Sequence, residues 1–401
     1  MRRLTKLVLL FAFSFWVSGC VAANGEVKAN ADTTPSSTHS NAEAPDPAPQ
    51  FPLLGDACSP DAEQFDAAHV QSFGRVEKTD AGLRFAWSGV ALGFHFRGSE
   101  FQIELDDSGR NWFGVEIDGV AVPGKLSAYV GHRCYRLAQK LAPGEHHLRL
   151  TRLTEAMLGE TTFVRANAGK DGEILALDPA PARRLEVIGD SITAAYGVEG
   201  ESRSCHFSSE TENESLSYAA ILGRHFGAEV SVVAWSGKGV FSNRGSTSDT
   251  IPMPVLWERT LPNRDDSHWD FASWQPDGVV IDLGTNDFAP ENHDKSPFAE
   301  AYRKFLARLR QVYPKAALFC ALSPLLSDQW PPGENARSTA RAGIEKAIDA
   351  LKARGDSRVF LVEHALETDA EGWGCDWHPS RVAQKRMADE LTGPIAKNLG
   401  W

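Results

Sequence analysis

The chain has 401 residues, of which 42% are hydrophobic, 23% charged and 9% aromatic. These proportions are ordinary for a globular protein and exclude a disordered, collagen-like or multi-span membrane chain. At about 150 residues per domain, the length predicts two domains, each large enough to bury a core. The net charge is −12 and no run rich in Lys or Arg stands out, so we do not expect a nucleic-acid partner.

The first residues indicate a secretion signal. Arg2, Arg3 and Lys6 precede an apolar run over residues 7–17. A basic start before a short apolar run is typical of a signal peptide, and the run is too short for a transmembrane helix. We therefore expect a signal peptide over residues 1–19.

The end of this signal resembles the bacterial lipobox, because it reads Val-Ser-Gly-Cys up to Cys20. Two or three acyl chains on that cysteine would hold the protein firmly on a membrane, whereas one chain binds marginally. The alternative is an ordinary signal peptide with a chance cysteine. From the lipobox we expect a lipid-anchored protein of the cell envelope. The residue after Cys20 is Val21 and not Asp, which in Gram-negative lipoproteins usually directs the protein to the outer membrane, so we expect that location if the source is Gram-negative.

Two stretches read as linkers. Residues 20–54 are rich in Ala, Asn, Thr, Ser and Pro, and such a stretch cannot bury enough apolar surface to offset its ordering entropy. We expect it to be a disordered tether. Residues 178–181 read Asp-Pro-Ala-Pro and predict a short second linker. The predicted domains therefore span residues 55–178 and 183–401.

Short alternating runs mark the first of these domains. Hydrophobic and polar residues alternate, with Gly and Asp between the runs, over 83–87, 92–96, 101–105, 113–117 and 147–150. Alternation at this spacing predicts an antiparallel β-sandwich of the jelly-roll type. A packing role is favoured here over sugar binding, because no chemistry-bearing residues gather in this domain.

The second domain changes to alternating strands and helices. Predicted strands cover 185–188, 230–235, 278–283, 316–322 and 359–362, and predicted helices cover 217–226, 298–312, 336–353 and 380–399. This alternation over about 220 residues predicts a doubly wound parallel sheet with helices on both faces. Ligands of such sheets bind beyond the carboxyl ends of the strands.

Five cysteines remain once Cys20 is set aside, an odd number for an oxidising compartment. Cys320 lies in the apolar strand 316–322 and is the expected buried free thiol. The sequence leaves the connectivity of the others open, and the pairs we favour are Cys58 with Cys134 and Cys205 with Cys375. No Cys-x-x-Cys pattern argues for zinc.

Ser191 follows the first strand of the second domain within Gly-Asp-Ser-Ile-Thr. A serine in a turn that leads from a strand into a helix exposes its hydroxyl, and the helix dipole favours developing negative charge there. Gly-Asp-Ser is also a common turn and N-cap sequence, so this motif is weak by itself.

Three further residues of interest each follow another predicted strand. Gly237 offers an unobstructed backbone N–H, and Asn286 offers a side-chain amide just past a strand end. His378 precedes the last helix, and Asp376 stands two residues before it. Asp190 and Asp287 are expected to hold hydrogen bonds at strand ends.

Taken in order, Ser191, Gly237, Asn286 and His378 resemble the SGNH (GDSL-type) hydrolases, which are named for these residue types. The fuller matches Gly-Asp-Ser-Ile-Thr, Ser-Gly-Lys-Gly-Val, Gly-Thr-Asn-Asp and Cys-Asp-Trp-His-Pro, together with the preceding jelly-roll-like domain, resemble carbohydrate esterase family 2 more closely. The resemblance covers roughly residues 60–401. It implies a flavodoxin-like catalytic domain that removes acetyl groups from xylan, glucomannan or related sugars without a metal or cofactor.

The residue types imply a serine-esterase mechanism, in which His378 takes the proton of Ser191 as it attacks the acetyl carbonyl. The expected oxyanion hole comprises the backbone N–H groups of Ser191 and Gly237 and the side-chain amide of Asn286. Many SGNH enzymes place an orienting Asp three residues before the histidine, where this chain has Cys375. Asp376 is therefore the expected orienting group, and a backbone carbonyl is the alternative.

Two tryptophans flank the catalytic turn. Trp377 is a candidate for stacking on a sugar ring, with packing equally favoured, whereas packing is favoured for Trp373. No metal ligands are predicted, because the remaining histidines that we considered lack partners at metal-ligand spacing: His206, His225, His268 and His364.

The sequence therefore predicts a lipid-anchored esterase that removes O-acetyl groups from acetylated polysaccharides or oligosaccharides. One alternative is an SGNH esterase for another acyl substrate, such as O-acetylated peptidoglycan or lipid. The other is a non-catalytic carbohydrate-binding lipoprotein. The presence of both Ser191 and His378 favours an enzyme over a binding protein.

Overall fold

The computed structural model of this protein describes residues 51–245, 250–292 and 294–401. The predicted signal peptide, the predicted lipidation site Cys20 and most of the predicted tether lie outside these ranges. The described residues belong to one compact unit. No helix within the described ranges has the length and apolar character needed to cross a membrane.

The first part of this unit is a sandwich of two antiparallel sheets. In one sheet the strands lie in the order β1 (Leu53–Gly55), β10 (Gly131–Ala138), β6 (Phe101–Asp107), β12 (Thr161–Asn167), β4 (Gly82–Phe85) and β3 (Glu77–Thr79). In the other the order is β13 (Glu173–Ile174), β5 (Ala91–Arg97), β11 (Glu145–Arg152), β7 (Trp112–Ile117) and β8 (Val120–Ala121), with β2 (Gln71–Phe73) on β5 and β9 (Leu126–Ser127) on β7.

The alternation of apolar residues explains the sandwich core. Phe94 and Phe96 of β5 point inward and contact Phe101 of β6, with ring centroids 5.0 and 4.8 Å apart. A disulfide joins Cys58 to Cys134 of β10, which is one of the pairs favoured from the sequence. The strand β1 begins at Leu53, inside the stretch predicted to be tether.

The second part is built on a parallel sheet. Its strand order is β15 (Glu229–Ala234), β14 (Arg184–Gly189), β16 (Gly278–Asp282), β17 (Ala317–Leu322) and β18 (Val359–Glu363), and every pairing is parallel. These strands are nearly continuous apolar runs because helices cover both faces. The order is that of a flavodoxin-like fold, as the sequence predicted.

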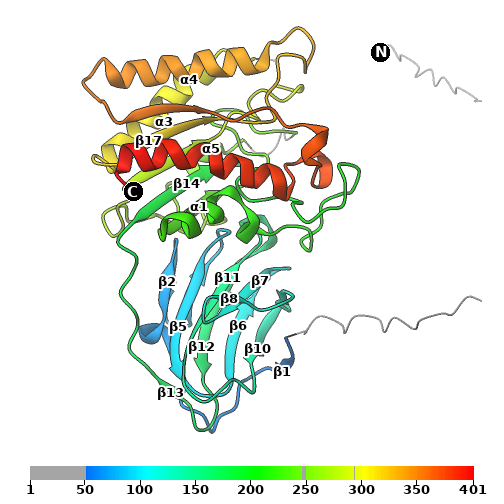
Figure 1. Cartoon of the computed structure of the whole chain (residues 1–401), viewed down its shortest axis with the longest axis vertical. Helices are drawn as coiled ribbons and strands as arrows, with labels where there is room; N and C mark the ends of the chain where they lie inside the picture. Colours follow the sequence, from blue (N-terminus) through cyan, green and yellow to red (C-terminus); the bar gives the residue numbers. More distant parts are fainter. Residues whose placement is uncertain (1–50, 246–249, 293) are drawn as a thin grey trace, which may run out of the picture. The chain divides into compact units, whose positions relative to one another are not determined.

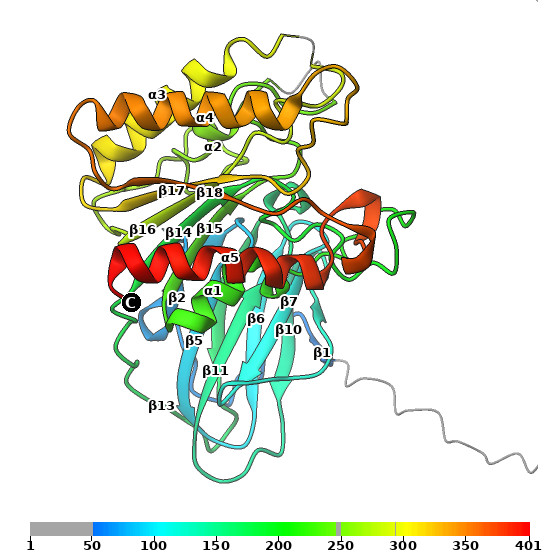
Figure 2. The ribbon, with the colours of Figure 1, turned by 45° about the horizontal axis from the view of Figure 1, so that its top comes forward.

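The helices divide between the two faces of this sheet (Figures 1 and 2). One face carries α1 (Tyr218–Phe226) and α5 (Arg381–Leu399), and the other carries α3 (Phe298–Val312) and α4 (Ala336–Lys352); the short α2 is Met253–Leu256. Serine residues cap the N-termini of α1 and α5, because Ser217 Oγ accepts the Ala220 N–H and Ser380 Oγ accepts the Val382 N–H.

A buried ion pair joins the sandwich to the parallel sheet. Arg75 follows β2, and its Nη2 lies 2.8 Å from Oε1 of Glu186 on β14, with both side chains fully buried. Arg75 also donates to the carbonyls of Trp257 and Arg259, which lie in the catalytic part. A buried charge left without its partner is strongly destabilising, so this pair couples the strand that ends near Ser191 to the sandwich.

Candidate active site

Ser191 lies in the turn after β14. A Cβ at Gly189 would lie 1.9 Å from Thr193 Oγ1, so only glycine lets this turn fold back against the strand. Hydrogen-bonded turns follow instead of a regular helix, and Ala195 interrupts them at φ 58°. The expectation that a helix N-terminus supports Ser191 is therefore wrong, because this left-handed residue breaks the helical path.

His378 completes the central pair. Its Nε2 lies 2.9 Å from Ser191 Oγ, and the Ser191 residue is only 8% exposed. Burial lowers the pKa of His378 to about 4, although two backbone carbonyls raise it and Arg244 lowers it further. The imidazole is therefore neutral at pH 7, which is the state that accepts a proton from the serine.

Backbone carbonyls orient His378. Its Nδ1 lies 3.1 Å from both the Cys375 and the Asp376 carbonyl oxygens, to which it donates. The Asp376 carboxylate turns elsewhere and accepts from Tyr196 Oη, His206 Nδ1 and the Phe207 N–H at 2.9–3.0 Å. The prediction that the Asp376 carboxylate orients His378 is therefore corrected in favour of the alternative.

A left-handed backbone explains this correction. Asp376 has φ 50° and ψ 40°, and this conformation turns its carbonyl toward the imidazole. Partial burial raises the pKa of the Asp376 carboxyl, but hydrogen bonds from His206, Phe207 and Tyr196 outweigh it and hold the pKa below its usual range. The carboxylate thus stays ionised and anchors the turn.

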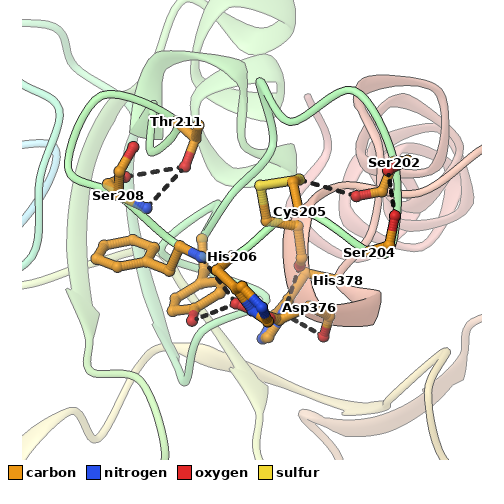
Figure 3. The surroundings of a disulfide bond; sticks show 11 residues. Ser202, Ser204, Cys205, His206, Ser208, Thr211, Asp376 and His378 are labelled. Carbon is orange, nitrogen blue, oxygen red and sulfur yellow. Dashed lines mark hydrogen bonds and ion pairs between the residues drawn. A yellow bond between two sulfur atoms is a disulfide. The ribbon is translucent and has the colours of Figure 1, made fainter.

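A disulfide holds the same turn (Figure 3). Cys375 is bonded to Cys205, and the Asp376 N–H donates to the Cys205 carbonyl at 2.9 Å. This is the second pair favoured from the sequence, and Cys320 is a free, buried thiol as expected. The Tyr196 ring also packs on the His378 ring, with centroids 4.2 Å apart. Tyr196 and the 199–211 loop therefore support the histidine, a role that no sequence motif signalled.

Two backbone N–H groups face no protein acceptor. Within the described ranges, neither the Ser191 nor the Gly237 N–H makes a hydrogen bond. Gly237 has φ 80°, a left-handed conformation that glycine adopts without strain. Both groups are therefore available to an oxyanion, in agreement with the sequence-based expectation.

Asn286 is committed to protein acceptors in this structure. Its Nδ2 donates to Asp190 Oδ2 at 3.0 Å and to the Lys238 carbonyl at 2.9 Å. Asn286 therefore ties the residue after Gly237 to the residue before Ser191. Because these two bonds use both Nδ2 hydrogens, the structure shows a positioning role that no sequence motif signalled, and the oxyanion role of Asn286 stays a prediction.

Buried carboxyl groups hold the rest of the Gly237 loop. Asp287 accepts the N–H groups of Val240, Phe241 and Ser242 at 2.7–2.9 Å. Burial raises the pKa of Asp287 to about 6 despite these hydrogen bonds, and burial raises the pKa of Asp190 to about 7. Both aspartates thus hold hydrogen bonds at strand ends, as predicted from the sequence.

The sandwich also contributes to this loop through Glu155. Its carboxylate accepts from both the backbone N–H and the Oγ of Ser236, the residue immediately before Gly237. Glu155 is fully buried, and its own N–H donates to Glu212 Oε2 at 3.2 Å. Burial raises the pKa of both carboxyl groups. Glu155 could not be recognised from the sequence, because a glutamate after a strand of another domain carries no signal of this role.

The two tryptophans beside the catalytic turn differ in exposure. Trp377 is 55% exposed, and the Arg203 guanidinium lies 4.4 Å from its ring centroid. Trp373 contacts Trp377 edge-on and donates from Nε1 to Asp369 Oδ1 at 2.7 Å. Trp377 therefore presents an aromatic surface near His378, whereas Trp373 braces it.

Two family models match this chain. One, described as carbohydrate esterase 2 N-terminal, matches residues 72–178, and the other, described as the GDSL-like lipase/acylhydrolase family, matches residues 187–386. A solved structure of a family two carbohydrate esterase from Clostridium thermocellum, in complex with cellohexaose, has a TM-score of 0.78 and 36% identity over 83% of this chain and 99% of that chain. The chain belongs to carbohydrate esterase family 2.

Curated relatives agree with this family. The chain is 37% identical over 332 residues to the cellulase/esterase CelE of Acetivibrio thermocellus, which covers 82% of this chain but only 39% of CelE. It is 25% identical over 340 residues to an acetylxylan esterase/glucomannan deacetylase of Cellvibrio japonicus, covering 83% of this chain and 90% of that protein. The predicted family and the predicted class, a carbohydrate esterase, are confirmed.

Proposed function

We propose that this family 2 esterase removes O-acetyl groups from polysaccharides or oligosaccharides of the xylan or glucomannan type. The observation that carries the proposal is the 2.9 Å hydrogen bond between Ser191 Oγ and His378 Nε2 at the carboxyl end of the parallel sheet. The name of the Cellvibrio japonicus relative, acetylxylan esterase/glucomannan deacetylase, supports this substrate class.

The reaction proceeds in two halves. Ser191 Oγ attacks the acetyl carbonyl carbon while its proton passes to His378 Nε2, and the Ser191 and Gly237 N–H groups bind the oxyanion. The tetrahedral intermediate then expels the sugar oxygen, which takes the proton from His378 and leaves an acetyl-Ser191 ester. Water attacks this ester with His378 again as the base, and acetate departs with Ser191 restored.

Trp377 supplies the surface on which the sugar stacks. The Arg203 guanidinium and the Trp373 ring both contact the indole and hold it in place, while Trp377 remains 55% exposed. The apolar face of the sugar ring contacts the indole of Trp377. This stacking positions the sugar, and with it the acetylated hydroxyl, without a specific hydrogen bond. This arrangement tolerates related sugars, in keeping with a mixed xylan and glucomannan substrate range.

The test uses residues 51–401, which leave out the predicted signal peptide and most of the predicted tether. Release of the acyl group is measured on acetylated xylan, acetylated glucomannan, O-acetylated peptidoglycan, an acyl lipid and an aryl acetate, with Ser191→Ala as the paired variant. We expect release by the wild type and a loss of about 10⁴–10⁶-fold in the variant. If the wild type acts on O-acetylated peptidoglycan or on an acyl lipid but not on the acetylated xylan and glucomannan, the proposed substrate class is wrong. If neither the wild type nor Ser191→Ala releases an acyl group but both bind the polysaccharides, the protein is a carbohydrate-binding protein and not an enzyme.

We also propose that Cys20 anchors the protein in the cell envelope, on the outer membrane of a Gram-negative source. The proposal rests on the sequence around Cys20 alone. Expression of the full chain in a Gram-negative host with labelled palmitate tests it, because Cys20→Ser should abolish labelling and release the protein from the membrane fraction. Equal labelling of both proteins would overturn the anchor.

A further inference from the structure

A second cluster of chemistry-bearing side chains lies on the sandwich. His95 of β5 and His147 of β11 stand directly opposite each other on neighbouring antiparallel strands. Asp178 follows β13 in the segment that leads to the catalytic part. One ring nitrogen of each histidine and one carboxylate oxygen of Asp178 all lie within 4.8 Å of one another. No sequence motif signals this set, because its members are far apart along the chain.

The Nε2 atom of His95 has a lone pair available to bind a metal ion. Its Nδ1 lies 2.7 Å from the Ala176 carbonyl oxygen, which can only accept, so the proton resides on Nδ1 and the lone pair on Nε2. Nε2 is buried and has no hydrogen-bond partner, and the nearest carboxylate oxygen, on Glu145, is 3.6 Å away. Metal-bound histidines characteristically donate their other N–H to a carbonyl or carboxylate in this way.

His147 and Asp178 complete the set. His147 Nε2 lies 3.0 Å from Asp178 Oδ2, an ion-pair distance at which a metal ion can replace the shared proton. The two imidazoles are stacked, with centroids 4.2 Å apart and an 18° interplanar angle. Two stacked rings direct their lone pairs nearly parallel, so one ring must turn to bind the same ion. The His147 side chain is 48% exposed and has room to do so.

We propose that His95, His147 and Asp178 bind one divalent transition-metal ion of the zinc class, with water in the remaining position. Two imidazoles and one carboxylate are typical zinc ligands, whereas Mg²⁺ and Ca²⁺ prefer sets made of oxygen atoms. The three side chains line a surface hollow together with Gln71, Phe73 and Arg149, so water has access to an ion held there.

Such an ion would fasten the linker to the sandwich. Asp178 is the first residue of the predicted linker 178–181, and the segment before it already runs along β5, where the Leu175 N–H donates to the His95 carbonyl at 3.0 Å (Figure 1). Gln71 Nε2 donates to the Asp178 carbonyl at 3.4 Å. Coordination by Asp178 would add a side-chain tie to these backbone ties, so the site joins strands β5 and β11 to the chain that enters β14.

The test measures zinc binding to the full chain, purified in detergent and treated with a chelator. Calorimetric titration with ZnCl₂ should show one site per chain that is lost, or weakened at least about tenfold, in His95→Ala and in His147→Ala. His69→Ala is the matched control, because His69 is 47% exposed and pairs with Asp66 Oδ1 at 3.1 Å but has no second imidazole. This control should bind zinc as the wild type does.

Thermal unfolding provides a second readout that does not depend on activity. Zinc should raise the Tm of the wild type and of His69→Ala but leave the Tm of His95→Ala unchanged, because an ion that binds only the folded state stabilises it. MgCl₂ at the same concentration should not reproduce the shift. The proposal is overturned if the wild type and both histidine variants bind zinc alike, or if Mg²⁺ competes equally for the site.

Discussion

The two sides of the Ser191–His378 pair are held in place by different chemistry. On the oxyanion side, the Gly237 loop is held by buried groups, namely Glu155 before it and Asn286 and Asp287 after β16. On the histidine side, the turn is held by a disulfide and by backbone carbonyls, with a carboxylate that is 33% exposed.

Because of this difference, we expect single side-chain substitutions to reduce activity by different amounts on the two sides. A buried hydrogen-bonding group has no water to replace a lost partner, so removing it leaves an unsatisfied group and a displaced loop. On the histidine side the orienting acceptors belong to the backbone and survive any single side-chain change. We therefore expect large effects of substitution on the oxyanion side and small effects around Asp376.

The largest effect should come from Asn286→Ala. This change removes the donor to Asp190 and to the Lys238 carbonyl, and it also removes the expected oxyanion donor. We expect kcat for acetate release to fall by about 10²–10³-fold, with KM little changed. Asn398→Ala is the control, since Asn398 Nδ2 donates to the Pro394 carbonyl at 2.9 Å within α5, away from the loop. A loss smaller than fivefold in Asn286→Ala would contradict the comparison.

Much of this architecture was predictable because local patterns encode it. The predicted helix 298–312 coincides with α3, whose apolar stripe faces the core, and the predicted strands of the parallel sheet differ from the observed ones by at most one residue at each end. These elements are buried on a regular period, so the sequence alone reveals them. Ser191 and His378 were found because each stands at a strand or helix end within a family motif.

What could not be predicted depends on residues that meet only in three dimensions. Glu155 reaches Ser236 from another domain, and His206 reaches Asp376 across the disulfide. The left-handed conformation of Asp376, which decides between its carboxylate and its carbonyl as the partner of His378, has no signature in the sequence. Tertiary contacts, rather than propensity, set these features.

A smaller effect is expected for Glu155, which tests whether the sandwich takes part in catalysis. Glu155→Ala leaves the Ser236 N–H and Oγ without their acceptor, so the residue before Gly237 is free to move. We expect kcat to fall about 10–100-fold, as misplaced catalytic groups typically cost. Glu155→Gln should recover most of the rate, because one amide oxygen still accepts the Ser236 N–H. Equal rates for Glu155→Ala and the wild type would show that the sandwich does not position the loop.

The pH dependence of kcat/KM should distinguish the two sides, because protonation on the oxyanion side should lower kcat/KM only a few-fold. Burial raises the pKa of Asp287 to about 6 and lowers that of His378 to about 4. As the pH falls from 7 to 5, Asp287 gains a proton and accepts its three N–H groups less strongly, while His378 stays neutral. We expect a partial fall in kcat/KM with a midpoint near 6 and a full loss only near pH 4. In Asp287→Asn the step near 6 should disappear, and any fall that remains near pH 7 belongs to Asp190, whose pKa burial raises to about 7. A single midpoint near 6.5 that survives in this variant would assign it to His378.

The same Asp287 shift predicts the opposite trend for stability. Its pKa is raised from 3.8 in the unfolded chain to about 6 in the fold, so the folded state binds more protons between these values. Its contribution to the free energy of unfolding is therefore fully present below pH 3.8 and is lost as the pH rises through about 6. Urea unfolding of the wild type and Asp287→Asn at several pH values measures the difference. A contribution that grows with pH would contradict the raised pKa.

The smallest effect should come from Asp376→Asn, and it bears most directly on how His378 is held. Removal of a carboxylate that orients a catalytic histidine costs about 10⁴-fold in kcat. Here the Cys375 and Asp376 carbonyls accept from Nδ1, and both remain in the variant. The new amide oxygen can still accept the Phe207 N–H, so the turn should keep its shape. We therefore expect kcat to stay within about tenfold of the wild type, far from the loss expected of a triad. A loss near 10⁴-fold, with the Cys205–Cys375 bond intact by mass spectrometry, would mean that the carboxylate turns to His378 during the reaction, and the two sides of the site would then be held by side chains alike.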